Sequence, residues 1–339
     1  MTNLERLQST GIQRVGTRKR GFRYRSLNAG AVTKSDLERI KNLRIPPAWT
    51  HVAVNSATKG RLQAVGQDAA GRWQYLYHEN HTRTQDAKKF RRLTKFAEAL
   101  PKMRAAISKD LRQTGLSRER VLACVLRILS SCSMRPGSEV YASENGSFGI
   151  ATLRSKHVAV KANAVHFDFP GKSGVRQQRE LKDRGVVKVM RSLLRERGRR
   201  VFRFENGNGE LVDVTSRHIN DYIKDVMGDS FSAKDFRTWA GTLICACALA
   251  RIGTSEEETT TARKKKIVAA IKETAEALGN TPAVCRGSYI CPSILTSFER
   301  GETVDDFFAS VESFLRYRGR GLHAAERALL KLLKRSASR

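Results

Sequence analysis

Two long apolar segments with the spacing of helices constrain most strongly how this chain can fold. Residues 118–133 (RERVLACVLRILSSCS) and 237–253 (RTWAGTLICACALARIG) carry apolar side chains around most of the helix circumference. A helix that is apolar on nearly all sides has to be buried inside a larger body. The chain has 339 residues, enough for about two domains. We therefore expect both segments to form core helices of a large, mostly helical domain.

The charge balance restricts the function of the chain. Its 63 Lys and Arg residues outnumber its 33 Asp and Glu residues, which gives a formal net charge of +30. A surface this basic attracts polyanions, and nucleic acid is the commonest polyanion in a cell. Hydrophobic residues make up 40% of the sequence, which excludes a wholly disordered chain. A metal-scavenging role fits this composition poorly.

The sequence contains no signal for a membrane or for secretion. No apolar run approaches the roughly eighteen residues of a membrane-spanning helix, and the N-terminus lacks the apolar segment of a secretory signal. The six cysteines show neither a CxxC pair nor the spacing of a metal site. We expect reduced, buried thiols, no metal, no membrane partner, and a protein of the cytoplasm.

The first 90 residues predict a small β-rich domain. Residues 1–30 are basic and show little periodicity, so we expect a partly flexible arm that could touch phosphates. Pro46-Pro47 blocks a helix, and residues 61–77 read as strand, turn and strand. Side chains of the second strand alternate between two faces. One face carries Trp73, Tyr75 and Tyr77, and the other carries Arg72, Gln74 and Leu76. The aromatic face could pack on a core, whereas Arg and Gln are residues that bind base edges.

Residues 91–339 predict a second, larger domain that is mostly helical. Thr215 or Ser216 can cap a helix that ends at Gly228. Residues 149–169 alternate like two or three short strands, and the tail from residue 303 predicts two more helices. The predicted fold class is α+β, with a small N-terminal antiparallel sheet domain and a larger helical domain.

Two basic residues stand at turns that follow predicted elements. Arg135 follows the apolar segment 118–133 and precedes Pro136-Gly137, which places a guanidinium where a helix gives way to a loop. Lys172 lies in the turn Pro170-Gly171-Lys172-Ser173-Gly174 after a strand. Each of them alone could be an ordinary surface residue.

Two further positions complete a pattern that runs along the chain. Lys234 and Arg237 open the second apolar helix, where free backbone N–H groups favour anions. The segment 280–289 begins with Asn280 and ends with Tyr289, which we expect on a short turn. A tyrosine there could be a nucleophile, although most tyrosines only pack.

Taken together, the order Arg135, Lys172, Arg237 and Tyr289 closely resembles the active site of type IB DNA topoisomerases, in the small form of poxviruses and bacteria. The resemblance covers most of the chain and is closer to bacterial members. It rests on these pieces: Arg135-x-Gly137 with Tyr141, Gly171-Lys172, Lys234-Asp235-x-Arg237-Thr238, the turn with Tyr289, and the strand 71–77. The family usually has a His where this chain has Asn280, nine residues before Tyr289.

The resemblance implies a role for each site residue. Tyr289 would attack a DNA phosphodiester and form a covalent 3′-phosphotyrosine. Lys172 would be the general acid, and Arg135 and Arg237 would bind the non-bridging oxygens. Asn280 would add a neutral hydrogen-bond donor that cannot shuttle protons. Lys234 would assist near the leaving oxygen.

The resemblance also implies a substrate and a set of partners. The enzyme would relax positive and negative supercoils of double-stranded DNA, as a nucleoid-associated monomer that clamps the duplex between its two domains. No cofactor is expected: no P-loop motif for ATP is present, and two guanidinium groups can take the place of a metal ion. The residues expected to contact DNA are Arg72, Gln74, Tyr75, Tyr77 and Tyr141. The fold implied is that of the catalytic domains of tyrosine recombinases and type IB topoisomerases.

Two other functions are compatible with parts of the sequence. A tyrosine recombinase or integrase uses nearly the same residues, but its second arginine box usually reads His-x-x-Arg, where this chain has Lys234-x-x-Arg237. Recombinases also tend to end soon after the tyrosine, whereas 50 residues follow Tyr289. Composition alone would favour a non-catalytic nucleic-acid-binding protein, and only the Arg–Lys–Arg–Tyr set argues against it.

Overall fold

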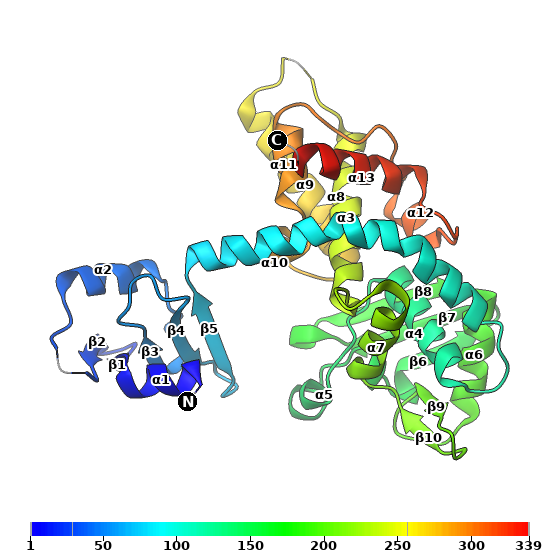
Figure 1. Ribbon diagram of the computed structural model, residues 1–339, viewed down its shortest axis with the longest axis horizontal. Coiled ribbons are helices and arrows are strands. Elements are labelled where there is room, and N and C mark those ends of the chain that lie inside the picture. The colour runs from blue at the N-terminus through cyan, green and yellow to red at the C-terminus, as the bar shows by residue number, and fades with distance from the viewer. Residues whose placement is uncertain (1, 29, 256, 338–339) are drawn as a thin grey trace. The chain divides into compact units, whose positions relative to one another are not determined.

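The computed structural model describes residues 2–28, 30–255 and 257–337, so Met1, Ala29, Glu256 and residues 338–339 lie outside the description (Figure 1). Internal contacts divide the chain into two units, residues 1–89 and 90–339. The division falls within α3 (Glu79–Asp110), a helix whose first turns belong to the N-terminal unit. Each unit has its own hydrophobic core.

The N-terminal unit is built on a five-stranded antiparallel sheet in the order β2-β1-β3-β4-β5. Because β5 pairs only with β4 in this sheet, it forms one edge. The strands are β1 (Ile12–Thr17), β2 (Gly21–Ser26), β3 (Thr50–Val54), β4 (Leu62–Gln67) and β5 (Trp73–Tyr77). The strand–turn–strand reading of residues 61–77 is confirmed.

The expectation of an irregular arm over residues 1–30 is wrong. This stretch forms α1 (Asn3–Thr10), which starts with a Thr2–Glu5 capping box, and then the hairpin of β1 and β2. Apolar periodicity is weak there because Leu7 and Ile12 are its only fully buried apolar side chains in the described residues. Arg14, a basic residue of β1, donates to the backbone carbonyl oxygens of Pro46 and Trp49, so part of the positive charge has a structural role.

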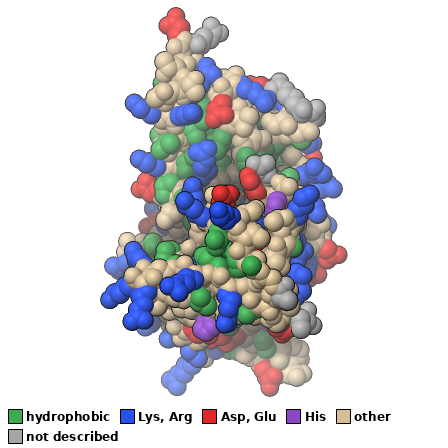
Figure 2. Space-filling view, turned by 90° about the vertical axis from the view of Figure 1, so that its left-hand side faces the viewer, with side chains coloured by type: hydrophobic (Ala, Val, Ile, Leu, Met, Phe, Trp, Pro, Cys, Tyr) green, Lys and Arg blue, Asp and Glu red, His purple; other side chains and the backbone are tan. Residues whose placement is uncertain are grey.

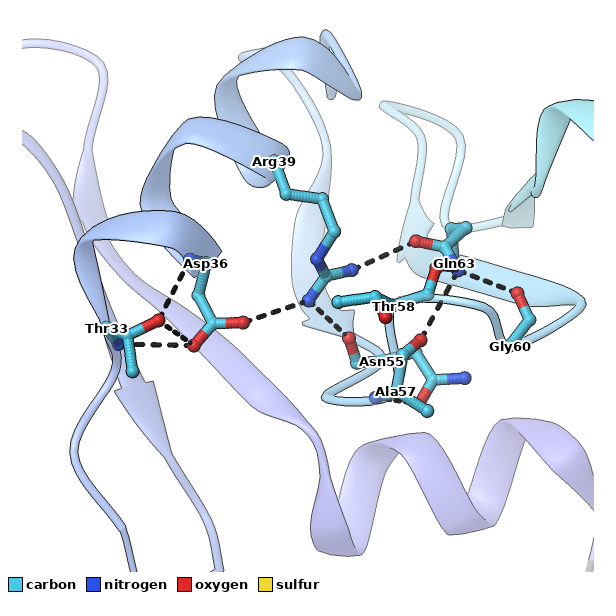
Figure 3. A network of polar contacts seen from close by, with 8 residues as sticks. All are labelled: Thr33, Asp36, Arg39, Asn55, Ala57, Thr58, Gly60 and Gln63. Atoms are coloured by element: carbon cyan, nitrogen blue, oxygen red, sulfur yellow. Dashed lines mark hydrogen bonds and ion pairs between the residues drawn. The ribbon is translucent and has the colours of Figure 1, made fainter.

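The two helices of the N-terminal unit, α1 and α2 (Lys34–Asn42), each contribute to a separate apolar cluster on the sheet. Leu7 of α1 packs with Leu62 and Val65, whereas Ile40 of α2 packs with Val52 and Val54. A polar network fixes the α2 side (Figure 3). In it, the guanidinium of Arg39 donates to Gln63 Oε1 at 2.9 Å and to the carbonyl oxygen of Asn55 at 2.7 Å, which ties α2 to the β3–β4 loop.

The second unit is mainly helical and is centred on α4 (Arg118–Cys132) and α8 (Ala233–Ile252) (Figure 1). These helices contain the two apolar segments of the sequence, and nearly all of their side chains are buried, as predicted. α9 and α13 pack against α8. The other helices are α5 (Glu139–Asn145), α6 (Arg184–Arg195), α7 (Ser216–Met227), α9 (Thr260–Leu278), α10 (Pro282–Ser288), α11 (Pro292–Glu299), α12 (Val311–Arg316) and α13 (Ala324–Ala337).

Two small antiparallel sheets complete the second unit. One has the order β6-β7-β8, with β6 (Val158–Lys161), β7 (Ala164–Pro170) and β8 (Arg176–Lys182), and the other pairs β9 (Arg203–Glu205) with β10 (Leu211–Asp213). Residues 149–169 differ from the prediction in part. They begin with two short 3₁₀ turns, η1 (Ile150–Thr152) and η2 (Ser155–His157), before β6 starts.

An antiparallel N-terminal sheet followed by a helix-rich unit confirms the α+β prediction. Within the described part of the chain, no helix combines the length and the apolar character needed to cross a membrane.

Candidate active site

Arg135 lies at the loop that follows α4. The helix ends at Cys132, and Ser133 then adopts a left-handed backbone (φ 50°) that turns the chain. The carbonyl oxygen of Arg135 accepts a hydrogen bond from Ile150 N at 2.9 Å. Gly137 (φ 86°) packs so tightly on Gly149 that a Cβ on Gly137 would lie 2.9 Å from the Gly149 backbone. The loop is therefore fixed, and the guanidinium of Arg135 is held half-buried.

Arg237 lies in the first turns of α8 and is only 3% exposed. Its two terminal nitrogens donate to the carbonyl oxygen of Ser133 and, at 3.1 Å, to that of Leu278. Burial and the nearby charge of Arg135 lower the pKa of Arg237, but a guanidinium stays protonated in proteins. A permanent positive charge is thus placed where the end of α4 meets the end of α9. Lys234, one turn earlier, is exposed.

Tyr289 does not lie on a simple turn, as the sequence suggested, but directly after the short helix α10. Its side chain is half-buried, and the guanidinium carbon of Arg237 lies 4.9 Å from the centre of its ring. Burial alone would raise the pKa of the Tyr289 phenol. The charge of Arg237, its hydrogen bond, and the charges of Arg135 and Lys234 outweigh burial, so the pKa is lowered below its usual value.

The backbone at Tyr289 is held by two residues of α8 that the sequence analysis did not identify. The hydroxyl of Thr242 donates to the carbonyl oxygen of Tyr289 at 3.1 Å and accepts from Cys291 N at 3.1 Å. Gly241 lets the chain approach, since a Cβ there would lie 2.9 Å from both Cβ and O of Tyr289. In the sequence both are small residues within an apolar run, which gives no signal of this role.

Asn280 follows Gly279, whose backbone is left-handed (φ 60°) after the end of α9. Its Oδ1 accepts a hydrogen bond from Arg135 Nη2. Its Nδ2 is buried and makes no hydrogen bond of normal geometry to any described residue, although it lies close enough to the Cys285 thiol to influence the pKa of that thiol. The amide thus links to Arg135 and retains a donor for a further acceptor.

Lys172 lies on the predicted hairpin, in the short turn η3 (Lys172–Gly174) between β7 and β8. Its side chain is exposed and makes no hydrogen bond or ion pair with another residue in the described ranges. The structure therefore brings together Arg135, Arg237, Asn280 and Tyr289, with the charge of Lys234 within electrostatic reach. Lys172 stands apart from these contacts.

The predicted DNA contacts of the N-terminal unit lie on the edge strand β5 and in the turn before it. Tyr75 and Tyr77 are 42% and 46% exposed, whereas Trp73 packs against the α1 cluster. Arg72 and Gln74 both bind the carboxylate of Asp68 at 2.9 Å, which lowers the pKa of Asp68 to about 2. Both readings of the aromatic face hold in part: Trp73 is a core residue, and the two tyrosines face solvent.

The last predicted contact, Tyr141, lies on α5 in the second unit and is 51% exposed. Within the described ranges, no cluster of three or more His, Cys, Asp and Glu side chains could hold a metal ion. The site instead offers cationic and amide N–H groups around a phenol. Such groups bind the oxygens of a phosphate and stabilise a phenolate that attacks it.

Comparison with known proteins is in keeping with this chemistry. Residues 78–293 match the family described as eukaryotic DNA topoisomerase I, catalytic core, and residues 21–68 match the bacterial DNA topoisomerase IB N-terminal domain. The DNA topoisomerase 1B of Acanthamoeba polyphaga mimivirus is 36% identical over 285 residues, which are 83% of this chain and 85% of the viral protein.

More distant relatives carry related names. The DNA topoisomerase 1B of Vaccinia virus (strain Copenhagen) is 25% identical over 265 residues, or 76% of this chain and 80% of the viral protein. The DNA topoisomerase 1 of Mycosarcoma maydis is 24% identical over 190 residues, or 50% of this chain and 18% of the fungal protein. These matches favour the topoisomerase prediction over the recombinase and the non-catalytic binder, and the chain is therefore an enzyme of the type IB DNA topoisomerase family.

Proposed function

We propose that this enzyme relaxes positive and negative supercoils by cutting one DNA strand, letting it swivel, and resealing it through a covalent 3′-phosphotyrosine. The observation that carries the proposal is the placement of Tyr289. Its ring lies under the buried guanidinium of Arg237, and the surrounding positive charges lower the pKa of its phenol. A cation beside the phenol favours the phenolate, which is the nucleophilic form.

In the proposed cleavage step the Tyr289 oxygen forms a bond to the phosphorus, and the bond from phosphorus to O5′ breaks. The phenol proton goes to solvent water. Lys172 donates a proton to O5′, which leaves as a hydroxyl. Resealing runs the same steps in reverse: O5′ attacks the phosphotyrosine, its proton returns to Lys172, and Tyr289 is released. The covalent bond conserves the energy of the cut phosphodiester, so the cycle is proposed to need neither ATP nor a metal ion.

The remaining site residues are proposed to bind the phosphate. Arg135 and Arg237 stabilise its two non-bridging oxygens as negative charge builds up on them in the transition state. The free Nδ2 of Asn280 donates to one of these oxygens, which supports the role of a neutral donor in place of the usual His. Lys234 supplies a further positive charge near the phenol.

Double-stranded DNA is the expected substrate of the family, and the charge of +30 suits it. Lys and Arg side chains are spread over the face shown in Figure 2, with fewer Asp and Glu. The edge strand β5 and the preceding turn present Tyr75 and Tyr77 on one face and Arg72 and Gln74 on the other, which supports their role as groove contacts. We propose that Tyr141 contacts DNA from the second unit.

Three further properties are proposed with this function. The enzyme acts as a monomer that closes its two units around the duplex, and it works in the cytoplasm on nucleoid DNA. The match of residues 21–68 to a bacterial domain supports a bacterial source.

The assignment of Tyr289 and Lys172 is tested with a short duplex that carries a single cleavage site. Tyr289→Phe should bind this duplex but form no covalent adduct. Lys172→Ala should cleave the ordinary duplex slowly, and should cleave at close to the wild-type rate when O5′ is replaced by sulfur, because a thiolate leaves without a proton.

Lys182→Ala is the matched control for Lys172→Ala, since Lys182 is an exposed lysine at the end of β8. It should leave both rates unchanged. An adduct formed by Tyr289→Phe would remove Tyr289 from its role. A Lys172→Ala defect that persists with the sulfur substrate would refute the general-acid assignment.

A further inference from the structure

Gln177 lies at the base of the hairpin that carries Lys172, and it points into the protein. It belongs to β8, pairs across the sheet with Phe169 of β7, and is only 8% exposed. Its neighbour Gln178 has the opposite orientation and is exposed, as alternation along a strand requires. A buried glutamine needs partners for its amide, so its contacts show what it connects.

On one side, Gln177 contacts the turn of the hairpin. Its Nε2 donates to the carbonyl oxygen of Val175 at 3.4 Å, and the same oxygen accepts from Gly171 N at 2.9 Å. A Cβ on Gly171 would lie 2.7 Å from Gln177 Cγ, so the chain passes directly over this side chain. Gly171 immediately precedes Lys172. Gln177 therefore supports the backbone from which the Lys172 side chain projects.

On the other side, Gln177 contacts the turn that carries Asn280. A Cβ on Gly279 would lie 2.6 Å from Gln177 Oε1, and the positive φ of Gly279 further restricts that position. Arg179 Nη2 donates to Gln177 Oε1 at 3.2 Å and to the carbonyl oxygen of Ala277 at 3.3 Å. The single side chain of Gln177 thus joins the backbone before Lys172 to the backbone before Asn280.

We propose that Gln177 is a positioning residue that sets the Lys172 hairpin against the Asn280 turn, and so brings the Lys172 ammonium group to O5′ of the bound phosphate. The inference rests on the proposed function. Lys172 has no side-chain partner of its own among the described residues, so its position depends on the base of the hairpin. Proton transfer needs the donor within hydrogen-bond reach of O5′, and a shift of about 1 Å can cost a large factor in rate.

The substrate with sulfur at the 5′ position separates this role from a merely structural one. If Gln177 acts through Lys172, its loss slows only the step that needs a proton. A general loosening of the site would also disturb Arg135, Asn280 and Tyr289, and it would slow cleavage of both substrates.

The experiment measures single-turnover cleavage of both duplexes by the full-length protein. Gln177→Ala should cleave the ordinary duplex roughly tenfold more slowly than the wild type and the sulfur duplex within about twofold of it. Gln177→Met, which keeps most of the volume but lacks the amide, should behave alike and serves if the alanine variant does not fold. Gln178→Ala, on the opposite face of β8, should match the wild type on both substrates.

Equal slowing on both substrates, or no slowing on either, would overturn the proposal for Gln177. Wild-type protein and Lys172→Ala are measured in the same series. If the sulfur substrate rescues Lys172→Ala but not Gln177→Ala, the proposed function stands and only the positioning role fails. If the wild type forms no adduct at Tyr289, both fail.

Discussion

Thr242 offers a direct test of how the helical core positions the nucleophile. Its side chain is fully buried in α8, and its hydroxyl is the link between that helix and the backbone on both sides of Ile290. Thr242→Val keeps the shape and the β-branching of the side chain but removes the hydroxyl. The carbonyl oxygen of Tyr289 then loses its donor, and Cys291 N loses this acceptor.

The expected cost follows from the two contacts. A buried hydrogen bond contributes about 1 kcal/mol, and a polar group left without a partner adds a penalty of similar size, so the free energy of unfolding should fall by about 2–3 kcal/mol. Because the backbone of Tyr289 is no longer fixed, cleavage by the folded variant should also slow, by about tenfold.

Urea denaturation measures the first effect, and single-turnover cleavage well below the melting temperature measures the second. Thr274→Val in α9 is the control: Thr274 is also fully buried, but its hydroxyl donates within its own helix, to the carbonyl oxygen of Ala270 at 2.8 Å. That variant should lose about 1 kcal/mol and cleave normally. The reasoning is refuted if Thr242→Val is no less stable than Thr274→Val and cleaves DNA as fast as the wild type.

Three more outcomes are expected. Lys234→Ala removes a charge that lowers the pKa of Tyr289, so the pKa rises and the increase of cleavage rate with pH moves to higher pH; an unshifted profile would contradict this. Asn280→Asp replaces the free donor by a negative charge, whose repulsion of a phosphate oxygen is about 4 kcal/mol at an effective dielectric constant of about 20. It should therefore cleave far more slowly than Asn280→Ala, and equal rates would exclude phosphate contact. Neutralising the exposed tip of the β1–β2 hairpin should weaken DNA binding and reduce its salt dependence by up to about 0.9 per lost phosphate contact, measured in a Tyr289→Phe background; an unchanged salt slope would show that the tip does not touch DNA. The hairpin residues to replace by alanine are Arg18, Lys19 and Arg20.

The sequence predicted well those features that depend on apolar pattern and turn chemistry. The two buried helices, the helix capped by Thr215 and closed by Gly228, and the strand–turn–strand unit of β4 and β5 all have local signals. The hairpin at residues 1–30 lacked such a signal, because its strands are polar on both faces and the buried surface is contributed by few side chains.

The site was predictable in its residue types but not in its geometry. Arg135, Arg237 and Tyr289 are separated by up to 154 positions, and only the family resemblance joined them in advance. The groups that hold them depend on tertiary contacts: the carbonyl oxygen of Ser133 for Arg237, and the hydroxyl of Thr242 for Tyr289. A threonine in an apolar run reads as core until the chain folds back onto it.

The central claim is that this chain breaks and rejoins DNA through Tyr289 without a metal ion or ATP. The most direct measurement incubates the purified protein with supercoiled plasmid in the presence of EDTA and in the absence of ATP, with half of each sample quenched in detergent to trap protein-bound nicks. The account predicts relaxation together with an adduct linked to the 3′ end, both lost in Tyr289→Phe. DNA binding with neither relaxation nor adduct would contradict it.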